Sequence, residues 1–505
     1  MKLFVPSERE PGETRVAMSV DIVKKLTGLG FEVTVEKGAG HLSRVTDSAF
    51  AEAGAVIGDG SDGGKADVIF KVRRPTPDEA QTYKKDALVL ASMDPFGHES
   101  DIEAMAKAGV CGFSMEFMPR ISRAQVMDVL SSQANLAGYQ AVIEAAVVYD
   151  RALPMMMTAA GTVPAARVFV MGAGVAGLQA IATARRLGAI VTATDVRPAA
   201  KEQVESLGAK FIAVEDDEFK QAETAAGYAK EMSKEYQQKQ ADLVASHIAK
   251  QDIVITTALI PGRAAPRLVT TEMMEKMAPG SVLVDLAIER GGNVEGAIAD
   301  EVASVGDVRV VGFQNMVGRI GASASALYAK NLYAFLETMV DKEAGALAVD
   351  WSDELVVATL LTRHGTIVHP AFVENSDSDD TGSGDVDSGK VDEPAIDDGQ
   401  EQSSEVAADD AENAKEAETV AGIEGAGEVS VAAEGHQADD LTRINGIGPT
   451  NASKLNDAGI SSFAQIAAWT SKEEEEFGER FAFPGRIERE EWVKQAKQLI
   501  DEEGS

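Results

Sequence analysis

The sequence predicts an α/β protein with two doubly wound, Rossmann-like lobes, each built on a parallel sheet, that face each other across a cleft. Short apolar strands alternate with helical stretches through residues 1–373, and the alternation restarts at RVFVMGAGVAGLQAIATARRLGAIVTATDVR, residues 167–197. After residue 373 the composition becomes acidic, and a short helical pattern follows. These observations predict a disordered acidic linker and a small all-α module after the two lobes.

The first lobe begins with an apolar strand at residues 1–5 and a helical pattern over residues 20–29 that ends at Gly30. The next segment, FEVTVEKG, alternates apolar and polar residues as a strand does. Three further strand-like runs follow, with the helical stretch DIEAMAKAG between the last two: DVIFKV, ALVLASM and CGFSMEF. We expect an N-terminal lobe over residues 1–135, completed by the segment 325–373.

The second lobe follows a long helical pattern, SSQANLAGYQAVIEAAVVYDRA, and the segment LPMMMTAAGTVP. Six strand-like runs separated by helical or turn-rich segments then form a second βαβ series: ARVFVMG, AIVTATD, KFIAV, DIVITTA, SVLVDLA and VRVVGF. This series predicts a nucleotide-binding Rossmann lobe over residues 136–324.

Composition excludes several classes of protein. The single cysteine, Cys111, excludes an internal disulfide, and the six histidines never pair at metal-ligand spacing, so we predict no metal. The N-terminal apolar run is too short for a signal peptide, and no run approaches the roughly 18 apolar residues of a membrane span. A cytoplasmic protein is expected.

The net charge of −35 is concentrated after the second lobe. Residues 374–440 hold 22 acidic residues against Lys390 and Lys415, a net charge of −20, and no aromatic residue occurs between Phe372 and Phe463. Such a segment buries too little apolar surface to offset its chain entropy, so residues 374–438 are predicted to be a disordered linker.

The C-terminal module, residues 439–505, contains LTRINGIGPTNASKLNDAGISSFAQIAAW, in which residues 445–448 resemble the hairpin of a helix-hairpin-helix fold. Such hairpins often present backbone amides to DNA phosphates, which makes nucleic-acid binding an alternative function. Residues 441–505 carry 12 acidic and 8 basic residues, however, and phosphate affinity depends on clustered cations. We therefore expect a docking module for a protein partner of unknown identity, and no direct contact with nucleic acid.

A glycine motif opens the second lobe. Gly172, Gly174 and Gly177 have the G-x-G-x-x-G spacing between a strand and a helix, which suits a dinucleotide pyrophosphate at the helix N-terminus. Asp195 ends the following strand, where its carboxylate can accept from a ribose hydroxyl and repel a 2′-phosphate. The site should therefore prefer NAD(H) to NADP(H), although Arg197 could soften that preference.

No general base for an ordinary dehydrogenase stands out. His41 and His98 lie in polar, turn-like sequence and read as solvated side chains. The segment MPRISRAQVMDVLSSQANLAGYQ instead brings together a cation, an amide, a carboxylate and a hydroxyl: Arg120, Gln125, Asp128 and Ser131. These groups suit a carboxamide and a ribose, but a surface helix start with a salt bridge explains them equally well.

Residues 1–373 resemble the NAD(H)-binding α1 subunit of proton-translocating NAD(P) transhydrogenases, in the alanine dehydrogenase and transhydrogenase superfamily. The similarity covers most of this region, including SEREPGETRVA, MPRISRAQVMDVLSSQANLAGY, PMMMTAAGTVPAARVFVMGAGVAGLQAIATARRLGA, ATDVRPAAKEQVESLGAKF, AETAAGYAKEMS, ITTALIPG and DLAIERGGN. The tail after residue 373 departs from the usual ending of that subunit.

The resemblance assigns roles to residues. It places a catalytic group around the nicotinamide: Arg120, Gln125, Asp128, Ser131 and Tyr228. It assigns the rest of NAD(H) to Gly172, Gly174, Val175, Gly177, Asp195, Val196, Arg197, Gly227, Gln240 and Leu259. Gly227 and Tyr228 fall in a long segment that is either a solvated loop or, as the resemblance implies, a mobile flap over NAD(H).

The resemblance also implies an activity without a base: direct hydride transfer between NADH and NADP⁺ held by a partner subunit. It further implies NADPH regeneration coupled to proton translocation in membrane-spanning subunits, and a location on the inner face of the cell membrane through those partners. A homodimer is implied too, with PMMMTAAGTVP as a contact hairpin.

Alanine dehydrogenase is the alternative enzyme. Arg15 and Lys71 match residues that bind its substrate, but its catalytic histidine belongs where this sequence reads LVLASMDPF, and Glu289 replaces its catalytic aspartate. Amino-acid oxidation is therefore not expected.

Overall fold

The computed structural model describes residues 1–214, 218–219, 233–260 and 262–373, and in the C-terminal region residues 439, 441–444, 447, 455, 460, 462–470 and 492–503. The chain divides into two units, Met1–Glu401 and Gln402–Ser505. The predicted acidic linker, residues 374–438, lies outside the described residues, and so do Gly227 and Tyr228.

The first sheet has six parallel strands in the order β3-β2-β1-β4-β5-β6. They are β1 (Lys2–Val5), β2 (Glu32–Glu36), β3 (Val56–Gly58), β4 (Val68–Arg73), β5 (Leu88–Ser92) and β6 (Cys111–Ser114). The chain winds outward from β1 in one direction and then from β4 in the other, so the predicted doubly wound topology is confirmed. The edge strand β3 was not predicted.

Four short helices connect these strands: α1 (Val20–Gly28), α2 (Asp47–Glu52), α3 (Pro77–Thr82) and α4 (Glu99–Ala108). A capping side chain marks the start of three of them, at Ser19, Thr46 and Thr76. Helix α3, for example, starts after Thr76, whose hydroxyl accepts from the N–H of Glu79 while the Glu79 carboxylate accepts from the N–H of Thr76. Pro77 occupies the first helical position, where its missing N–H costs nothing.

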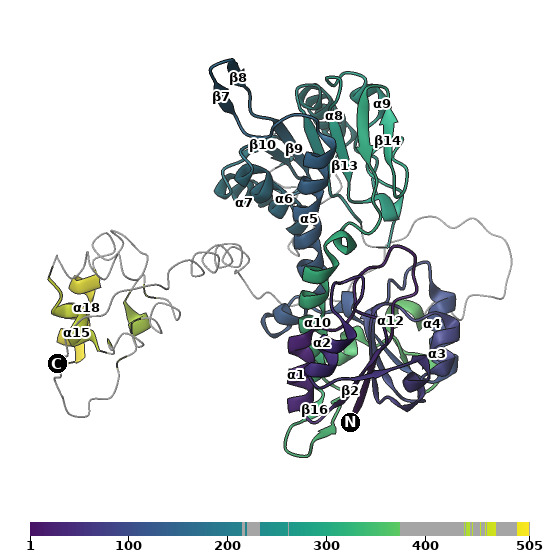
Figure 1. The fold of residues 1–505 in the computed structure, drawn as a ribbon. Coiled ribbons are helices and arrows are strands. Elements are labelled where there is room, and N and C mark those ends of the chain that lie inside the picture. Colours follow the sequence, from purple (N-terminus) through teal and green to yellow (C-terminus); the bar gives the residue numbers. More distant parts are fainter. Residues whose placement is uncertain are drawn as a thin grey trace. The chain divides into compact units, whose positions relative to one another are not determined.

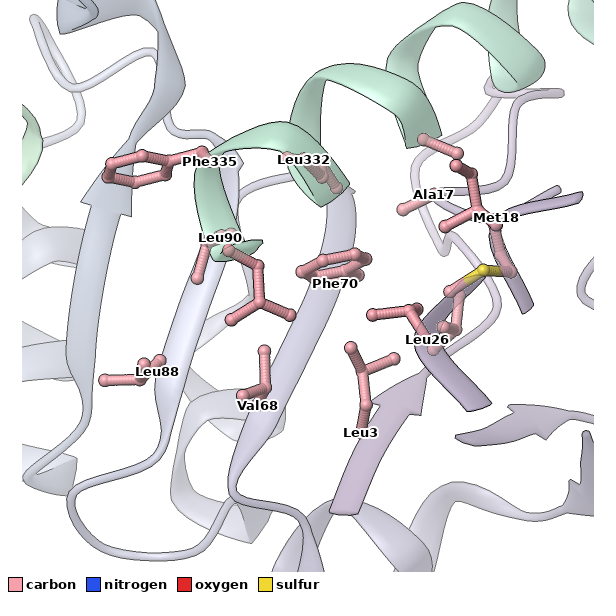
Figure 2. Close-up of a cluster of buried hydrophobic side chains, with 14 of the residues drawn as sticks. Leu3, Ala17, Met18, Leu26, Val68, Phe70, Leu88, Leu90, Leu332 and Phe335 are labelled. Atoms are coloured by element: carbon pink, nitrogen blue, oxygen red, sulfur yellow. The ribbon is translucent and has the colours of Figure 1, made fainter. Parts of the chain in front are cut away.

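The strands bury side chains on both faces of the first sheet. On one face, residues of β1, β4 and β5 pack against α10 (Gly321–Glu337), the helix by which the chain returns to the first lobe (Figures 1 and 2). Leu3, Phe70 and Leu90 belong to this face, and Leu332 and Phe335 of α10 cover it (Figure 2). The intervening residues Phe4, Ile69 and Val89 face α3 and α4. The alternation follows from the two-residue repeat of a strand.

The second sheet has seven strands in the order β11-β10-β9-β12-β13-β15-β14. They are β9 (Arg167–Met171), β10 (Ile190–Thr194), β11 (Lys210–Phe211), β12 (Ile253–Thr256), β13 (Val282–Asp285), β14 (Val302–Val305) and β15 (Val308–Val311). All pair in parallel except β14, which pairs antiparallel with β15 at the edge. The two-residue turn between them contains Gly306 at φ 59°, and so short a connection allows only an antiparallel pair.

Helices cover both faces of the second sheet, namely α6 (Val175–Arg186), α7 (Ala200–Ser206), α8 (Lys234–Ile248) and α9 (Thr271–Met274). Helix α5 (Val129–Val148) runs lengthwise between the two lobes and contacts both α6 and α10 (Figure 1). Within the described part of the chain, none of these helices is long and apolar enough to span a membrane.

The segment PMMMTAAGTVP forms a hairpin of β7 (Met156–Thr158) and β8 (Gly161–Val163), which extends away from the second sheet (Figure 1). Its strands are exposed along their whole length, and the side chains of Met155 and Met157 are 63% and 77% exposed.

The C-terminal unit has a small apolar core of its own. Its described elements are helical, namely η7 (Leu441–Arg443), α15 (Phe463–Ala467) and α18 (Trp492–Glu503). Trp492 and Phe463 are buried together with Leu441, Ile444 and Ile466. Ser462 caps α15 through a reciprocal pair of bonds with Gln465. Of the predicted hairpin at 445–448, only Ile447 is among the described residues.

Candidate functional site

The glycine-rich turn joins β9 to α6, and its three glycines have three different environments. Gly172 has φ 106°, and a Cβ there would lie 2.4 Å from the Thr257 hydroxyl. A Cβ on Gly177 would lie 1.8 Å from the carbonyl oxygen of Gly172, so α6 can pack this closely only with glycine. Gly174 caps α6 and has open space around it. A tight turn, a free approach and close helix packing are what a pyrophosphate site requires.

Asp195 follows β10 and reaches back to this turn. Its Oδ2 accepts from the N–H of Ala173 at 2.7 Å, and its Oδ1 accepts from the N–H of Arg197 at 2.9 Å. The Arg197 guanidinium also donates to both carboxylate oxygens, at 3.0 and 3.1 Å. The Asp195 side chain is therefore only 7% exposed, and Arg197 must turn aside before a ribose hydroxyl can reach it.

Other predicted contacts lie around the same edge of the second sheet. Gln240 on α8 donates to the Thr194 hydroxyl at 3.2 Å and accepts from the N–H of Val214 at 3.0 Å, so it joins α8 to the end of β10. Val196 and Leu259, after β10 and β12, are 56% and 54% exposed, and Val175 is 41% exposed. These residues follow strands β9, β10 and β12, where the strand order reverses and where ligands of such sheets bind.

The segment predicted to hold the nicotinamide lies on the first lobe. Arg120 and Gln125 are exposed, with Gln125 in the short helix η3 (Ser122–Met127). Asp128 caps α5, because its carboxylate accepts from the N–H of Ser131 at 2.9 Å and from the Ser131 hydroxyl at 2.6 Å. A helix start is thus present here, and the salt bridge beside it joins Arg123 to Asp353 and Glu354.

A cleft of about 1340 Å³ separates the lobes. The first lobe contributes Arg15, Asp94 and Gln133, and the second contributes Ala176, Thr257, Leu259 and Glu289. Among the described residues with a predicted cofactor role, Leu259 alone lines this cleft, which reaches the glycine turn at Ala176. His41 and His98 also line it, although both were expected to be solvated turn residues; the His98 side chain is 35% exposed.

Two structural residues of the site were missed at the sequence level. Gly138 on α5 lies against α6, where a Cβ would come 2.0 Å from the carbonyl oxygen of Ala176. Asn293 is fully buried and holds the loop that carries Leu259, because its amide bonds the N–H and carbonyl of Ala258 at 3.1 and 2.9 Å. The glycine-glycine-asparagine sequence at residues 291–293, in the turn region that follows β13, could have indicated Asn293. Gly138 depends on two helices that only the fold brings together.

Arg15 and Lys71 match residues that bind the amino-acid substrate in alanine dehydrogenase. Here both side chains pair with other residues of the first lobe. Arg15 donates to Glu13 at 2.6 and 2.8 Å and to Gln133 at 3.0 Å. Lys71 is 1% exposed and lies 3.3 Å from Glu8 and 3.1 Å from Glu79.

Burial opposes ionisation of Glu13, but hydrogen bonds from Arg15 and the charges of Arg15 and Arg73 lower its pKa to about 2. Glu289 behaves differently. Burial raises its pKa more than Arg73 and Arg15 lower it, because protein surrounds its carboxyl within the cleft although 43% of its side chain is accessible. Among the described residues, no group of three or more His, Cys, Asp and Glu side chains is arranged to hold a metal.

Two doubly wound lobes with a glycine-rich dinucleotide turn define a nucleotide-binding α/β protein, and comparison with known families specifies it. Residues 4–137 match the model of the alanine dehydrogenase/PNT N-terminal domain, and residues 141–370 match that of the C-terminal domain. The chain belongs to the alanine dehydrogenase/PNT family. Residues 441–500 match the RS2/RL21/YNQ2 HHH domain, which confirms the helix-hairpin-helix prediction.

This family contains transhydrogenase subunits and alanine dehydrogenases, and the sequence identity of this chain differs between the two groups. An NAD(P) transhydrogenase alpha subunit of Rhodospirillum rubrum is 54% identical over 378 residues, 74% of this chain and 98% of that protein. A crystal structure of transhydrogenase from Sinorhizobium meliloti is 65% identical, with a TM-score of 0.67, and covers 73% of this chain and 100% of that one. Alanine dehydrogenase 1 of Staphylococcus aureus is 29% identical over 360 residues, 68% of this chain and 88% of that protein. The chain is much more similar to transhydrogenase alpha subunits than to this alanine dehydrogenase.

Proposed function

We propose that this chain is the NAD(H)-binding α1 subunit of a proton-translocating NAD(P) transhydrogenase of the Si-specific/Re-specific type. The observation that carries the proposal is the glycine turn at Gly172–Gly177 with Asp195 bonded to it, in a chain 54% identical to a transhydrogenase subunit. A Cβ at either end of the turn would collide with its neighbours, while Gly174 stays open, so the turn fits a pyrophosphate.

In this role the second lobe binds the adenosine and pyrophosphate of NAD(H). Backbone N–H groups at the start of α6 face the phosphates, and the Asp195 carboxylate accepts from the ribose once Arg197 turns aside. Gln240 and Leu259 complete the edge from α8 and the loop after β12. Val175, Val196, Gly227 and Arg197 complete the cofactor contacts.

The first lobe orients the nicotinamide. Gln125 and Arg120 are exposed and are proposed to contact the carboxamide and ribose, while Asp128 and Ser131 fix the start of α5 that follows them. Tyr228 joins this group from the segment outside the described residues. Bound NADH supplies a hydride to NADP⁺ on the partner subunit, and that exchange between two carbons needs no proton transfer. Orientation of the two rings is therefore the whole catalytic task, and positioning alone can supply roughly 7 to 11 kcal/mol.

The proposal includes partners. A second subunit binds NADP(H), and membrane-spanning subunits translocate protons. These partners hold this chain at the inner face of the cell membrane. The complex as a whole regenerates NADPH. The apolar hairpin of β7 and β8 supports a homodimer. Its methionines are 44 to 77% exposed, and exposed apolar side chains on a projecting hairpin are stabilised when a second protein surface buries them. The C-terminal module is proposed to dock an unknown protein partner.

One experiment separates transhydrogenase from alanine dehydrogenase. The chain alone should bind NADH and should not reduce NAD⁺ with alanine. Mixed with a soluble NADP-binding transhydrogenase subunit, it should transfer hydride between nicotinamides without a membrane. Pyruvate formation from alanine, or NADH binding with no transfer in the mixture, would contradict the proposal.

A further inference from the structure

Two ion pairs of opposite polarity cross the cleft. The first lobe provides Asp94, just after β5, and Arg73, at the end of β4. The second lobe provides the neighbours Glu289 and Arg290 in the short helix η5 (Ile288–Arg290) after β13. Arg290 donates to the Asp94 carboxylate, and Arg73 lies 3.7 Å from Glu289. We call these four residues the interlobe clasp.

The backbone holds Asp94 in place for this contact. Asp94 has φ 44°, a left-handed conformation that aspartate and asparagine adopt more readily than most residues. Its N–H donates to Glu116 at 2.5 Å, and its carbonyl bonds His98 Nδ1 at 2.9 Å. Two residues further, the ring of Phe96 lies beside Gly262 of the second lobe, where a Cβ would be 3.6 Å from the ring. The loop after β5 thus bridges the lobes with both a charge and a ring.

The order of charges selects one alignment of the lobes. A slide by one position in one direction would place Asp94 against Glu289, and a slide in the other direction would place Arg73 against Arg290, so either slide replaces attractive pairs with a repulsive one. All four side chains are 24 to 43% exposed, so water screens each pair and its effect on an equilibrium is about fivefold at most. The clasp is therefore strong enough to favour one alignment and weak enough to open.

Lobe alignment matters because the predicted cofactor contacts are divided between the lobes. Gln125 and Asp128 lie on the first lobe, while Gly172–Gly177 and Asp195 lie on the second. A ligand of fixed length can contact both groups of residues only when the two lobes are the right distance apart. Its reactive ring is therefore placed correctly at only one distance between the lobes.

We infer that the interlobe clasp positions the nicotinamide of bound NADH by holding the two lobes at the spacing that both halves of the site require. The inference rests on the proposed function, because NADH is the ligand that spans the lobes. Asp94 and Arg290 are positioning residues that act through lobe alignment, and the contacts to NADH belong to other side chains.

The test measures the distance between lobes directly in the full-length chain. Spin labels at Glu52→Cys and Lys276→Cys, both exposed, report on the first and second lobe. The only native cysteine, Cys111, is 3% exposed, and burial raises its pKa to about 11, so it should resist labelling. Pulsed electron resonance should show one narrow distance distribution in the parent, broadened in about 1 M salt because screening weakens the clasp.

Arg290→Gln should broaden and lengthen the distribution, and it should raise the Kd for NADH about twofold to fivefold. Asp94→Asn should do the same, since asparagine keeps the left-handed backbone. Lys84→Gln, which breaks the Lys84–Asp67 pair inside the first lobe, is the matched control and should change neither measurement.

Unchanged distances and NADH affinity in both single variants would overturn the inference. If the Arg290 variant does not fold, Glu289→Gln tests the second pair by the same two measurements. Neither measurement uses hydride transfer, so absence of transfer to NADP⁺ would contradict only the proposed function.

Discussion

Asp195 and Ala173 are joined by a hydrogen bond of 2.7 Å, in which the Ala173 N–H donates to the Asp195 carboxylate. The bond links the end of β10 to the glycine-rich turn after β9. One side chain therefore holds the glycine-rich turn in shape and also supplies the acceptor proposed for the ribose.

Replacing Asp195 with Ala should weaken NADH binding by on the order of 1 to 3 kcal/mol, because a charge-assisted acceptor is lost. It should also reduce the difference in affinity between NADH and NADPH. Asp195→Asn keeps an acceptor for the Ala173 N–H but removes the charge. It should therefore discriminate less between NADH and NADPH while the glycine-rich turn stays intact. Fluorescence titration with both cofactors measures these effects. Equal affinity of the parent chain for NADH and NADPH would contradict the assignment.

Gln125→Ala and Asp128→Asn should slow hydride transfer far more than they weaken NADH binding, since these residues are proposed to set ring geometry. Asparagine is chosen at 128 because it can still cap α5 toward Ser131. Single-turnover transfer to a soluble NADP-binding subunit is the measurement, with Ser122→Ala in the same short helix as control. Transfer rates unaffected by both changes would remove these residues from the catalytic group.

Gly138→Ala should destabilise the chain by about 1 to 3 kcal/mol and weaken NADH binding, because the new Cβ meets the Ala176 backbone at the first turn of α6. Gly28→Ala is the matched helical control. Nothing lies within 4 Å of a Cβ there, so alanine should be neutral or slightly stabilising. Thermal unfolding and NADH titration compare the two variants. Equal stability and equal NADH affinity would show that α5 and α6 can move apart to accommodate a Cβ at position 138 at little cost.

Glu13 should make stability depend on pH in the acid range. Its folded pKa of about 2 lies below the ordinary value of 4.5, so its stabilisation is complete above about pH 4.5 and is lost as the pH falls toward 2. Glu13→Gln should lower stability near neutral pH by about 3 kcal/mol and should flatten the decline of the melting temperature between pH 6 and pH 3.5. Parallel curves for the two proteins would exclude this carboxylate as the cause.

The full chain should not bind fluorescent duplex DNA at micromolar concentration in about 0.15 M salt, because residues 441–505 have an acidic excess and lack a cation cluster. Fluorescence anisotropy is sufficient for this test. Salt-sensitive binding in that range would restore nucleic-acid recognition as the function of the module.

Local sequence patterns were enough to predict most of the fold. The strands β1, β2, β4 to β6, β9 to β13 and β15 match predicted apolar runs, and only β4 extends beyond its run, by one residue. A strand buried on both faces needs an apolar side chain at nearly every position, which makes such runs visible in the sequence. The strands β3 and β14 escaped prediction because they are partly exposed edge strands and lack the apolar run of a strand that is buried on both faces.

The sequence by itself determined the glycine spacing, the acidic residue after β10 and the family, because these depend on residues close together in the chain. Only the tertiary structure decided that Arg197 covers Asp195, that Gly138 touches Ala176, and that Asp94 meets Arg290 from the opposite lobe. The last pair is 196 residues apart in sequence. Such contacts follow from the packing of whole elements, and periodicity contains no information about which charged side chain will face another across a cleft.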